Sequence, residues 1–308
     1  MNEQDLMEQD KRLKEKMAKI KHTLIVMSGK GGVGKTTVAV NLAYALSIAG
    51  KKVGILDIDL HGPNIAKMLG IEKQAICIHE FGIEPVEVSK NLQAVSIALA
   101  GYDPDQPMIW RGPMKAKVIM QFLADVNWGE LDYLIIDSPP GTGDEPLSAC
   151  QLIPNVTGAV IVTTPQDVAV LDARKSVQFA KALKIPVVGI IENMSGFICP
   201  HCHTEIDIFK KGGGEKAAEE LKISFLGRVP FQLEFVEYAD KGTPFVSFKE
   251  KSTLRLPRPL GRGSLRVDTE PCCLPLPERA GSGSVEVSKS AEAFMGIVDK
   301  IKEFIGDK

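Results

Sequence analysis

The sequence lacks an excess of charge of one sign. Lysine and arginine together number 37 and aspartate and glutamate 39, which leaves a formal net charge of −2 over 308 residues. A nearly neutral chain exerts no long-range attraction on nucleic acid or on an anionic membrane. We therefore expect no nucleic acid and no membrane among its partners.

Long apolar runs and a secretory leader are also missing. No stretch approaches the ~18 apolar residues of a membrane span, and residues 1–22 are too charged for the apolar core of a secretory leader. The expected location is therefore cytoplasmic. Cysteine is scarce, and in a reducing compartment it is better explained by thiols or metal ligands than by a disulfide framework. The cysteines are Cys77, Cys150, Cys199, Cys202, Cys272 and Cys273.

Short apolar runs alternate with stretches of helical length and amphipathic pattern. The runs occupy residues 22–29, 52–59, 131–140, 158–165 and 186–193, and helices are predicted at 36–48, 113–126 and 168–183. The runs are rich in Val, Ile and Leu without polar alternation, as in strands that are covered on both faces. This order predicts an α/β fold with a doubly wound, mainly parallel sheet.

Composition divides the chain into segments. We expect a charged helical extension at 1–21, the α/β domain at 22–252, a loop, insertion or linker rich in Arg, Pro and Gly at 253–284, and an amphipathic helix at 285–308. The extension has apolar residues at helical spacing (Leu6, Leu13, Met17 and Ile20), and so does the last helix (Phe294, Ile297, Val298, Ile301, Phe304 and Ile305). Mixed charge on the polar face of the last helix favours packing on the domain or in a dimer over binding to a membrane surface.

A glycine-rich motif follows the first predicted strand. GKGGVGKTT fits G-x-x-x-x-G-K-[ST], a pattern that occurs by chance in roughly one chain of this length in a hundred. Its glycines allow backbone N–H groups to surround phosphates at the N-terminus of the next helix. Lys35 should reach the β- and γ-phosphates of ATP, and the Thr36 hydroxyl should bind Mg²⁺. The predicted phosphate site consists of Gly29, Lys30, Gly31, Gly32, Val33, Gly34, Lys35, Thr36 and Thr37.

Aspartates follow two of the predicted strands. Asp57 and Asp59 end the run LDID, and Asp137 ends the run LIID. Ligands bind at the carboxyl ends of strands in this architecture, where carboxylates can hold the waters of a metal ion and orient an attacking water. A lone aspartate at such a place is commonly a helix cap, but three of them beside a phosphate loop favour a nucleotide site.

The stretch ICPHCH contains Cys199 and Cys202. A C-x-x-C pair occurs by chance in roughly one chain in ten at this cysteine content, so the pair could be a redox dithiol, half of a metal site, or an accident. Redox chemistry requires the first thiolate to be stabilised at a helix N-terminus, whereas HTEIDIF, which follows, alternates like a strand.

A metal or an iron–sulfur cluster needs four ligands, and one chain offers two well-placed cysteines. Two chains related by a twofold axis offer four. A bridged homodimer would therefore need neither Cys77 nor Cys150, which we expect to be ordinary buried thiols. His201 and His203 fit the surroundings of such a site better than its ligand set.

The form KGGVGKT, with an additional lysine at Lys30, resembles the deviant Walker A motif of the MinD/ParA/nitrogenase-iron-protein group of P-loop ATPases. The resemblance implies that Lys30 reaches the nucleotide of a partner subunit, as an arginine finger does. It also implies that Asp59 positions the hydrolytic water, that Asp137 is the Walker B carboxylate, and that Asn193 contacts the adenine base.

Longer motifs narrow the resemblance. WRGPM, WGELDYLIIDSPPGTGD, ENMSGFICPHC and FKKGGGEKAAEEL resemble the Mrp/ApbC-type iron–sulfur cluster carriers, over about residues 21–252 and again from 285. This implies a homodimer that holds a labile [4Fe–4S] cluster between Cys199 and Cys202 of each subunit. It also implies slow ATP hydrolysis, transfer of the cluster to apoproteins, and contact with assembly scaffolds.

The chain departs from these carriers in several respects. It lacks the extra N-terminal domain of many bacterial members, and its segment 253–284 has no recognised counterpart. A four-cysteine N-terminal segment found in longer relatives is absent, so no second cluster is expected there. Gln232 stands where relatives commonly carry an aspartate, which affects any contact with the base or ribose.

Two other functions remain open at the level of sequence. A MinD/ParA-like positioning ATPase would share the phosphate loop and the amphipathic tail but would give Cys199 and Cys202 no role. A thiol oxidoreductase would use the same two cysteines as its redox pair.

Overall fold

The computed structural model describes residues 3–79, 82–101, 112–198, 204–232, 234–249 and 289–307. Its helices are α1 (Glu3–Met17), α2 (Lys35–Ile48), α3 (Ile65–Met68), η1 (Ile97–Leu99), α4 (Gly112–Asp125), α5 (Asp144–Leu152), α6 (Asp167–Ala182), α7 (Gly213–Leu221), α8 (Glu234–Asp240), η2 (Phe245–Lys249) and α9 (Lys289–Ile305). Its strands are β1 (Ile20–Met27), β2 (Val53–Asp57), β3 (Cys77–His79), β4 (Gly82–Glu84), β5 (Val86–Ser89), β6 (Leu92–Val95), β7 (Leu131–Asp137), β8 (Gly158–Thr163), β9 (Val187–Ile198), β10 (Glu205–Ile206) and β11 (Phe225–Phe231).

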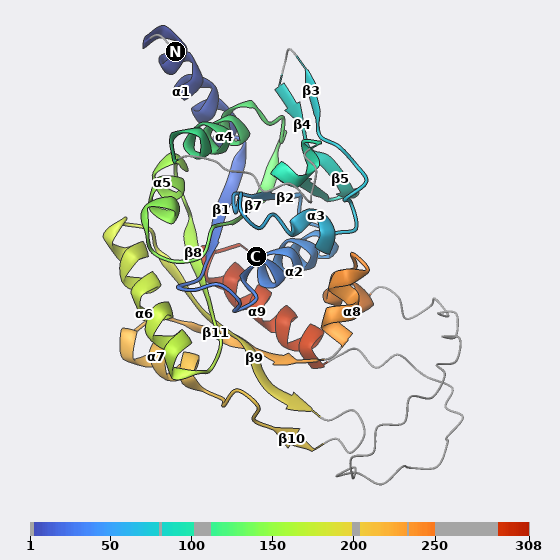
Figure 1. Ribbon diagram of the computed structural model, residues 1–308, viewed down its shortest axis with the longest axis vertical. Coiled ribbons are helices and arrows are strands. Elements are labelled where there is room, and N and C mark those ends of the chain that lie inside the picture. The colour runs from blue at the N-terminus through green and yellow to red at the C-terminus, as the bar shows by residue number, and fades with distance from the viewer. Residues whose placement is uncertain are drawn as a thin grey trace, which may run out of the picture.

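One mainly parallel sheet forms the centre of the molecule (Figure 1). Its strand order among the described residues is β10-β9-β8-β1-β7-β2-β6-β5, and β11 also pairs with β9. The β5–β6 and β9–β10 pairs are antiparallel, and the other pairs are parallel. From β1 the chain passes to β2, towards the β5 edge of the sheet, whereas from β7 it passes to β8, towards the β10 edge. The direction of winding therefore reverses between the neighbouring strands β1 and β7. Such reversal points are where open α/β sheets bind their ligands.

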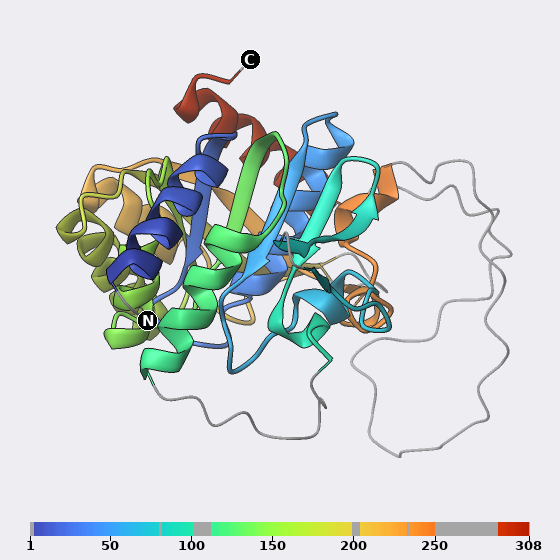
Figure 2. The same ribbon diagram turned by 90° about the horizontal axis from the view of Figure 1, so that it is seen from above.

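Helices cover both faces of the sheet. Helices α2 and α9 contact each other on one face, and α4, α5 and α6 lie on the other (Figure 2). Helix α2 is apolar on nearly all sides because it is enclosed between the sheet and α9. Strands β2 and β8 are buried along their whole length, which accounts for their unbroken apolar sequences.

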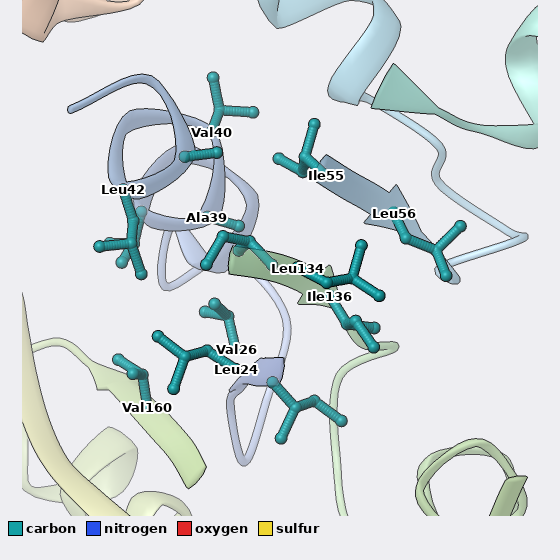
Figure 3. Packing of buried hydrophobic residues seen from close by; sticks show 14 of the residues in the cluster. Leu24, Val26, Ala39, Val40, Leu42, Ile55, Leu56, Leu134, Ile136 and Val160 are labelled. Carbon is teal, nitrogen blue, oxygen red and sulfur yellow. The ribbon is translucent and has the colours of Figure 1, made fainter. Parts of the chain in front are cut away.

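The hydrophobic core joins the sheet to α2. Figure 3 shows Ala39, Val40 and Leu42 of α2 beside Leu24 and Val26 of β1, Ile55 and Leu56 of β2, Leu134 and Ile136 of β7, and Val160 of β8. Each of these ten side chains has 0% exposure. This packing fixes the start of α2 against the carboxyl ends of β1 and β7.

The predicted fold class is confirmed, with small shifts at element ends. The first strand begins at Ile20 instead of His22, and the last predicted strand continues past Asn193 to Ile198. Strands β3 to β6 were not predicted, because they are three or four residues long and carry no apolar run. Residues 253–284, with Cys272 and Cys273, lie outside the described residues.

The helix predicted at the N-terminal end is present. Leu13 and Met17 of α1 are buried, and the helix packs along α4. Among the residues that the structure describes, no helix is both long enough and apolar enough to cross a bilayer.

An aromatic stack connects α9 to the rest of the molecule. Phe294, with 0% exposure, meets the ring of Phe245 edge-on at a centroid distance of 5.4 Å, and Phe245 stacks on Phe235 of α8 at 4.3 Å. Aromatic pairs in these arrangements add to the stability gained from burial alone. The last helix is thereby linked through η2 to α8.

Two expectations about single side chains were wrong. Phe304 was expected on the buried face of α9 but is 45% exposed, because the last turn of the helix lies near Gly158, where β8 begins and the sheet ends. Cys77 was expected to be buried but is exposed, because β3 pairs with β4 in a separate two-stranded ribbon instead of joining the main sheet. Cys150 is buried as expected.

These two phenylalanines provide a matched test of how α9 contributes to stability. We expect Phe294→Ala to lower the free energy of unfolding by ~3–5 kcal/mol, since a large buried ring leaves a cavity. Phe304→Ala, in the same helix, should change it by no more than about 0.5 kcal/mol. Urea unfolding followed by circular dichroism measures both values, and equal losses in the two variants would contradict the packing described.

Candidate functional site

A cleft of about 410 Å³ opens at the carboxyl ends of the central strands. Most of the predicted phosphate loop lines it, together with Asp59. Its lining residues from the sequence prediction are Lys30, Gly31, Gly32, Gly34, Lys35, Thr36, Thr37 and Asp59. Gly29, Val33, Asp57, Asp137 and Asn193 do not line the cleft. Gly29 lies against the Asp172 backbone of α6, where a Cβ atom would come within 2.2 Å of Asp172 O, and the other four are described below.

The phosphate loop owes its shape to glycines. Gly32 and Gly34 have φ angles of 79° and 80°, in the left-handed region that favours glycine. A Cβ atom on Gly34 would also come within 2.2 Å of the Asn193 amide nitrogen. Gly34 precedes α2 and has no side chain to cap its first N–H groups, so these donors are available to phosphate oxygens.

Backbone contacts join the loop to the end of β7. Gly141 N donates to Ser28 O at 2.8 Å, and the Ser28 hydroxyl donates to Lys30 O at 3.0 Å. Ser138, just after β7, donates through its hydroxyl to Val26 O at 2.8 Å. The two segments that would surround a phosphate are therefore held to each other as well as to the sheet.

Lys35 and Thr36, the first residues of α2, both contact Asp137. The Lys35 ammonium donates to Asp137 Oδ1 at 2.6 Å, and the Thr36 hydroxyl donates to Asp137 Oδ2 at 2.7 Å. Lys35 also lies 3.8 Å from Asp59. The lysine is 6% exposed and Asp137 only 1%, so this is a buried ion pair. Removing either partner would leave the other charge buried without compensation, which strongly destabilises a protein.

Asp57 adds a second buried carboxylate beside Asp137. The parallel register places Asp57 opposite Asp137, on the adjacent strands β2 and β7. Asp57 accepts hydrogen bonds from the Ser96 hydroxyl and from Asp59 N, each at 3.1 Å. Burial, and then the nearby charge of Asp137, raise the pKa of Asp57 well above its usual range. Burial also raises the pKa of Asp137, although the charge of Lys35 opposes the increase.

These carboxylates fit a magnesium ion that arrives with a nucleotide. Asp57, Asp59 and Asp137 lie around Lys35. Burial and the proximity of other carboxylates raise the pKa values of Asp57 and Asp137, and a bound cation would favour their charged forms. Within the described part of the chain, no group of three or more His, Cys, Asp or Glu forms a metal cage by itself. Mg²⁺ in ATPases usually binds one or two protein groups together with substrate phosphates. The hydroxyl of Thr36 and the carboxylate of Asp137 could supply such groups.

Lys30 lines the mouth of the cleft, partly exposed, and no ion pair joins it to another residue that the structure describes. Its ammonium is therefore available to a group outside the described chain. Asp59 accepts a hydrogen bond from Gly62 N at 3.4 Å and is 14% exposed at the cleft.

Asn193 lies behind the phosphate loop. Its amide nitrogen donates to Val33 O at 2.9 Å, and the side chain is 5% exposed. Asn193 therefore holds the loop backbone from the side of β9. The contact with adenine that the resemblance implies stays a prediction.

The wall of the cleft opposite the phosphate loop was missed by the sequence reasoning. It is formed by Asn64, Lys67 and Met68, at and within α3, and by Ala239 and Asp240 of α8. The stretch LHGPN, directly after Asp59, would have been the available signal for the first group, because it continues a segment already assigned to the site. No comparable motif marks α8.

The predicted cysteine site falls outside the described residues. Cys199 and Cys202 are not among them, whereas Ile198, the last residue of β9, and Glu205, the first of β10, are paired with each other. Cys77 and Cys150 lie on β3 and α5. Burial raises the pKa of the Cys150 thiol to about 11, so it stays protonated at neutral pH.

The buried carboxylates make stability depend on pH in a defined direction. Because the pKa of Asp57 is raised in the folded state, stability of the nucleotide-free protein falls as pH rises through that pKa. We expect Asp57→Asn, which cannot ionise, to raise Tm more at pH 8 than at pH 5.5, by about 2–4 °C for each kcal/mol gained. Differential scanning calorimetry without nucleotide or Mg²⁺ measures this, and a difference independent of pH would contradict it.

Comparison with known proteins places this site in a family. Residues 19–256 match the family model described as ParA, NUBPL iron-transfer P-loop NTPase. The chain is 56% identical over 241 residues to an iron-sulfur cluster carrier protein of Methanocaldococcus jannaschii, covering 78% of this chain and 83% of that protein. It is 48% identical over 243 residues to a protein of Dictyostelium discoideum named cytosolic Fe-S cluster assembly factor NUBP2 homolog, covering 77% and 92%.

Solved structures agree with this assignment. A nucleotide-binding protein from Archaeoglobus fulgidus, in complex with ADP, is 40% identical and superposes with a TM-score of 0.67, covering 76% of this chain and 91% of that one. The cell division ATPase MinD of Pyrococcus furiosus, at 21% identity, shares the fold, with a TM-score of 0.58 over 92% of this chain and 99% of that one. The glycine-shaped loop, the Lys35–Asp137 pair and these matches together show that the chain belongs to the family of NUBPL-type iron-transfer P-loop NTPases.

Proposed function

We propose that this ATPase is a cytoplasmic homodimer that carries a labile [4Fe–4S] cluster, bound by Cys199 and Cys202 of each subunit, to apoproteins. The observation that carries the proposal is the course of β9. This strand passes beside the phosphate loop at Asn193 and ends at Ile198, one residue before Cys199. The names of relatives as iron-sulfur cluster carriers support the cluster as cargo, and the name of the Dictyostelium relative supports the location.

Nucleotide binding must rearrange the buried ion pair. Lys35 contacts Asp137 here, and it would exchange that carboxylate for the β- and γ-phosphates of ATP. The exchange leaves Asp137 and the Thr36 hydroxyl to hold Mg²⁺. The bound ion would neutralise charge that develops on the phosphates.

The other residues of the cleft serve hydrolysis and its control. Asp59, at the cleft and 3.8 Å from Lys35, would orient the attacking water. Lys30, which has no ion-pair partner among the described residues, would supply positive charge to the nucleotide of the partner subunit. Hydrolysis is then slow in isolated subunits, and the nucleotide controls how closely two subunits approach and how tightly they hold the cluster. Apoprotein clients and assembly scaffolds would act on the dimer.

The two alternative functions receive less support. Support for a positioning ATPase comes from a structure of MinD that is 21% identical to this chain, and such a likeness shows the fold alone. A thiol oxidoreductase requires a helix after the first cysteine, but the described residues that follow the pair, Glu205 and Ile206, form a strand.

The cluster proposal predicts where iron binds. After anaerobic reconstitution we expect about two iron and two sulfide per chain in the wild type, since a [4Fe–4S] cluster is shared by two subunits. Cys199→Ala/Cys202→Ala should retain neither. Cys77→Ala, at an exposed cysteine outside the proposed site, serves as the matched control and should bind as the wild type does. Equal iron in the double variant and the wild type would overturn the carrier proposal.

The dimer proposal predicts complementation between two inactive variants. Lys30→Ala and Asp59→Asn should each lose ATP hydrolysis. If Lys30 acts across the dimer, a mixed dimer has one site with both groups intact, so an equal mixture should recover about a quarter of the wild-type rate. If Lys30 acts within its own subunit, neither site of the mixed dimer is complete. No recovery in a mixture shown by native mass spectrometry to contain mixed dimers would contradict the role in trans.

A further inference from the structure

Glu192 is a fully buried carboxylate that the proposed function does not use. It lies on β9, directly before Asn193, and has 0% exposure. A buried charge is costly unless it is paired and hydrogen-bonded. The partners of Glu192 therefore indicate what this residue is placed to hold.

Its carboxylate joins segments that lie about twenty residues apart in sequence. The Ser195 hydroxyl and Gly212 N, at 2.9 Å, donate to Oε1, and Gly214 N donates to Oε2 at 2.5 Å. Arg228 of β11 supplies a positive charge, with Nε 3.4 Å from Oε1. Gly212 and Gly214 lie at the start of α7, where backbone N–H groups favour a negative charge. A Cβ atom on Gly214 would come within 3.1 Å of Oε2, which accounts for glycine there.

These partners lie on either side of the cysteine pair. Ser195 precedes Cys199, and Gly212 follows Cys202. Both residues donate to the Glu192 carboxylate, so the two ends of the segment that contains the cysteines are bound to the same group. Between these points, β10 pairs with Phe197 and Ile198. Glu192, Ser195, Gly212 and Gly214 together form what we call the clamp.

Asn193 connects the clamp to the nucleotide site. Side chains of consecutive strand residues point to opposite sides, so Glu192 faces the start of α7 while Asn193 faces Val33 of the phosphate loop. Met194, the next residue, has a φ of 54°, a conformation that residues other than glycine rarely adopt. Strained residues of this kind persist where the structure on both sides holds them, and here Asn193 and Ser195 are both anchored.

We propose that Glu192 is a positioning residue, which fixes the base of the cysteine-bearing segment relative to the phosphate loop and makes the environment of Cys199 and Cys202 respond to nucleotide. This inference rests on the proposed function. A movement of Val33 on nucleotide binding is passed through Asn193 to the strained backbone at Met194 of β9, and the clamp passes it to both ends of the segment together. Without the clamp, the two ends of the segment move independently of the loop.

Alkylation of the cysteines in the full-length protein tests the proposal. Iodoacetamide labelling of Cys199 and Cys202 is followed by peptide mass spectrometry, with and without Mg²⁺ and a non-hydrolysable ATP analogue. The exposed Cys77 gives the internal reference rate. We expect the analogue to change the labelling rate of the pair in the wild type but not that of Cys77. Glu192→Gln and Ser195→Ala should remove this nucleotide dependence and raise the basal rate about fivefold, as expected when one buried hydrogen bond is lost locally.

Controls separate positioning from a general loss of structure. Glu215→Gln removes the other acidic partner of Arg228 but leaves the clamp intact, so it should behave as the wild type. Ser195→Thr keeps a hydroxyl and should restore the nucleotide dependence lost in Ser195→Ala. If Glu192→Gln fails to fold, the comparison of Ser195→Ala with Ser195→Thr tests the proposal instead. Calorimetry of the ATP analogue shows whether each variant still binds nucleotide.

The outcomes distinguish this inference from the proposed function. Wild-type nucleotide dependence in Ser195→Ala and in a folded Glu192→Gln would overturn the clamp, even if the wild type binds a cluster. Loss of that dependence in both variants, in a protein that binds no iron, would support the clamp and overturn the carrier proposal. A wild type whose labelling does not respond to nucleotide would overturn the clamp as a coupling element.

Discussion

The nucleotide site depends on the parallel register of β1, β7 and β2. Val26 lies opposite Asp137, and Asp137 lies opposite Asp57, so the hydrogen-bonded sheet itself brings two carboxylates together in a buried place. Lys35 enters this place because α2 is packed on the same strands and begins at their carboxyl ends. The protein thus holds two buried carboxylates next to each other, and burial raises the pKa of both. Burial, which makes the proximity of these charges costly, would also strengthen each contact with a bound phosphate.

Strand β9 has a different role from its neighbours. It pairs with β8 from Val187 to Glu192 and with β11 from Ile190 to Phe197, and its last two residues pair with β10. Beyond Glu192 the strand has lost its pairing with β8, and it ends directly before Cys199. Glu192 and Asn193 lie where the pairing with β8 ends, and their side chains face opposite sides of the strand. These neighbouring residues therefore contact two separate segments, the start of α7 and the phosphate loop.

Much of this architecture could be predicted from sequence because its signals are local. The phosphate loop is contiguous, and the aspartates directly follow apolar runs, so position along the chain was enough to bring them together. Contacts between separate segments gave no such signal. The wall made by α3 and α8, and the bonds from Glu192 to Gly212 and Gly214, depend on how the chain returns to the sheet. Helical periodicity placed Phe304 on the correct face of α9 but could not show where the sheet beneath it ends.

The aromatic stack has a consequence for the order in which the site can form. Phe235 belongs to α8, whose Ala239 and Asp240 line the cleft, and Phe235 rests on Phe245, which meets Phe294 of the last helix. The phosphate loop is encoded near the beginning of the chain, but the support for the opposite wall is encoded near its end. During synthesis, when domains fold as the chain emerges, the nucleotide cleft would therefore be among the last features to be completed. A ribosome would have to synthesise the chain past Phe294 before this wall of the cleft had its full support.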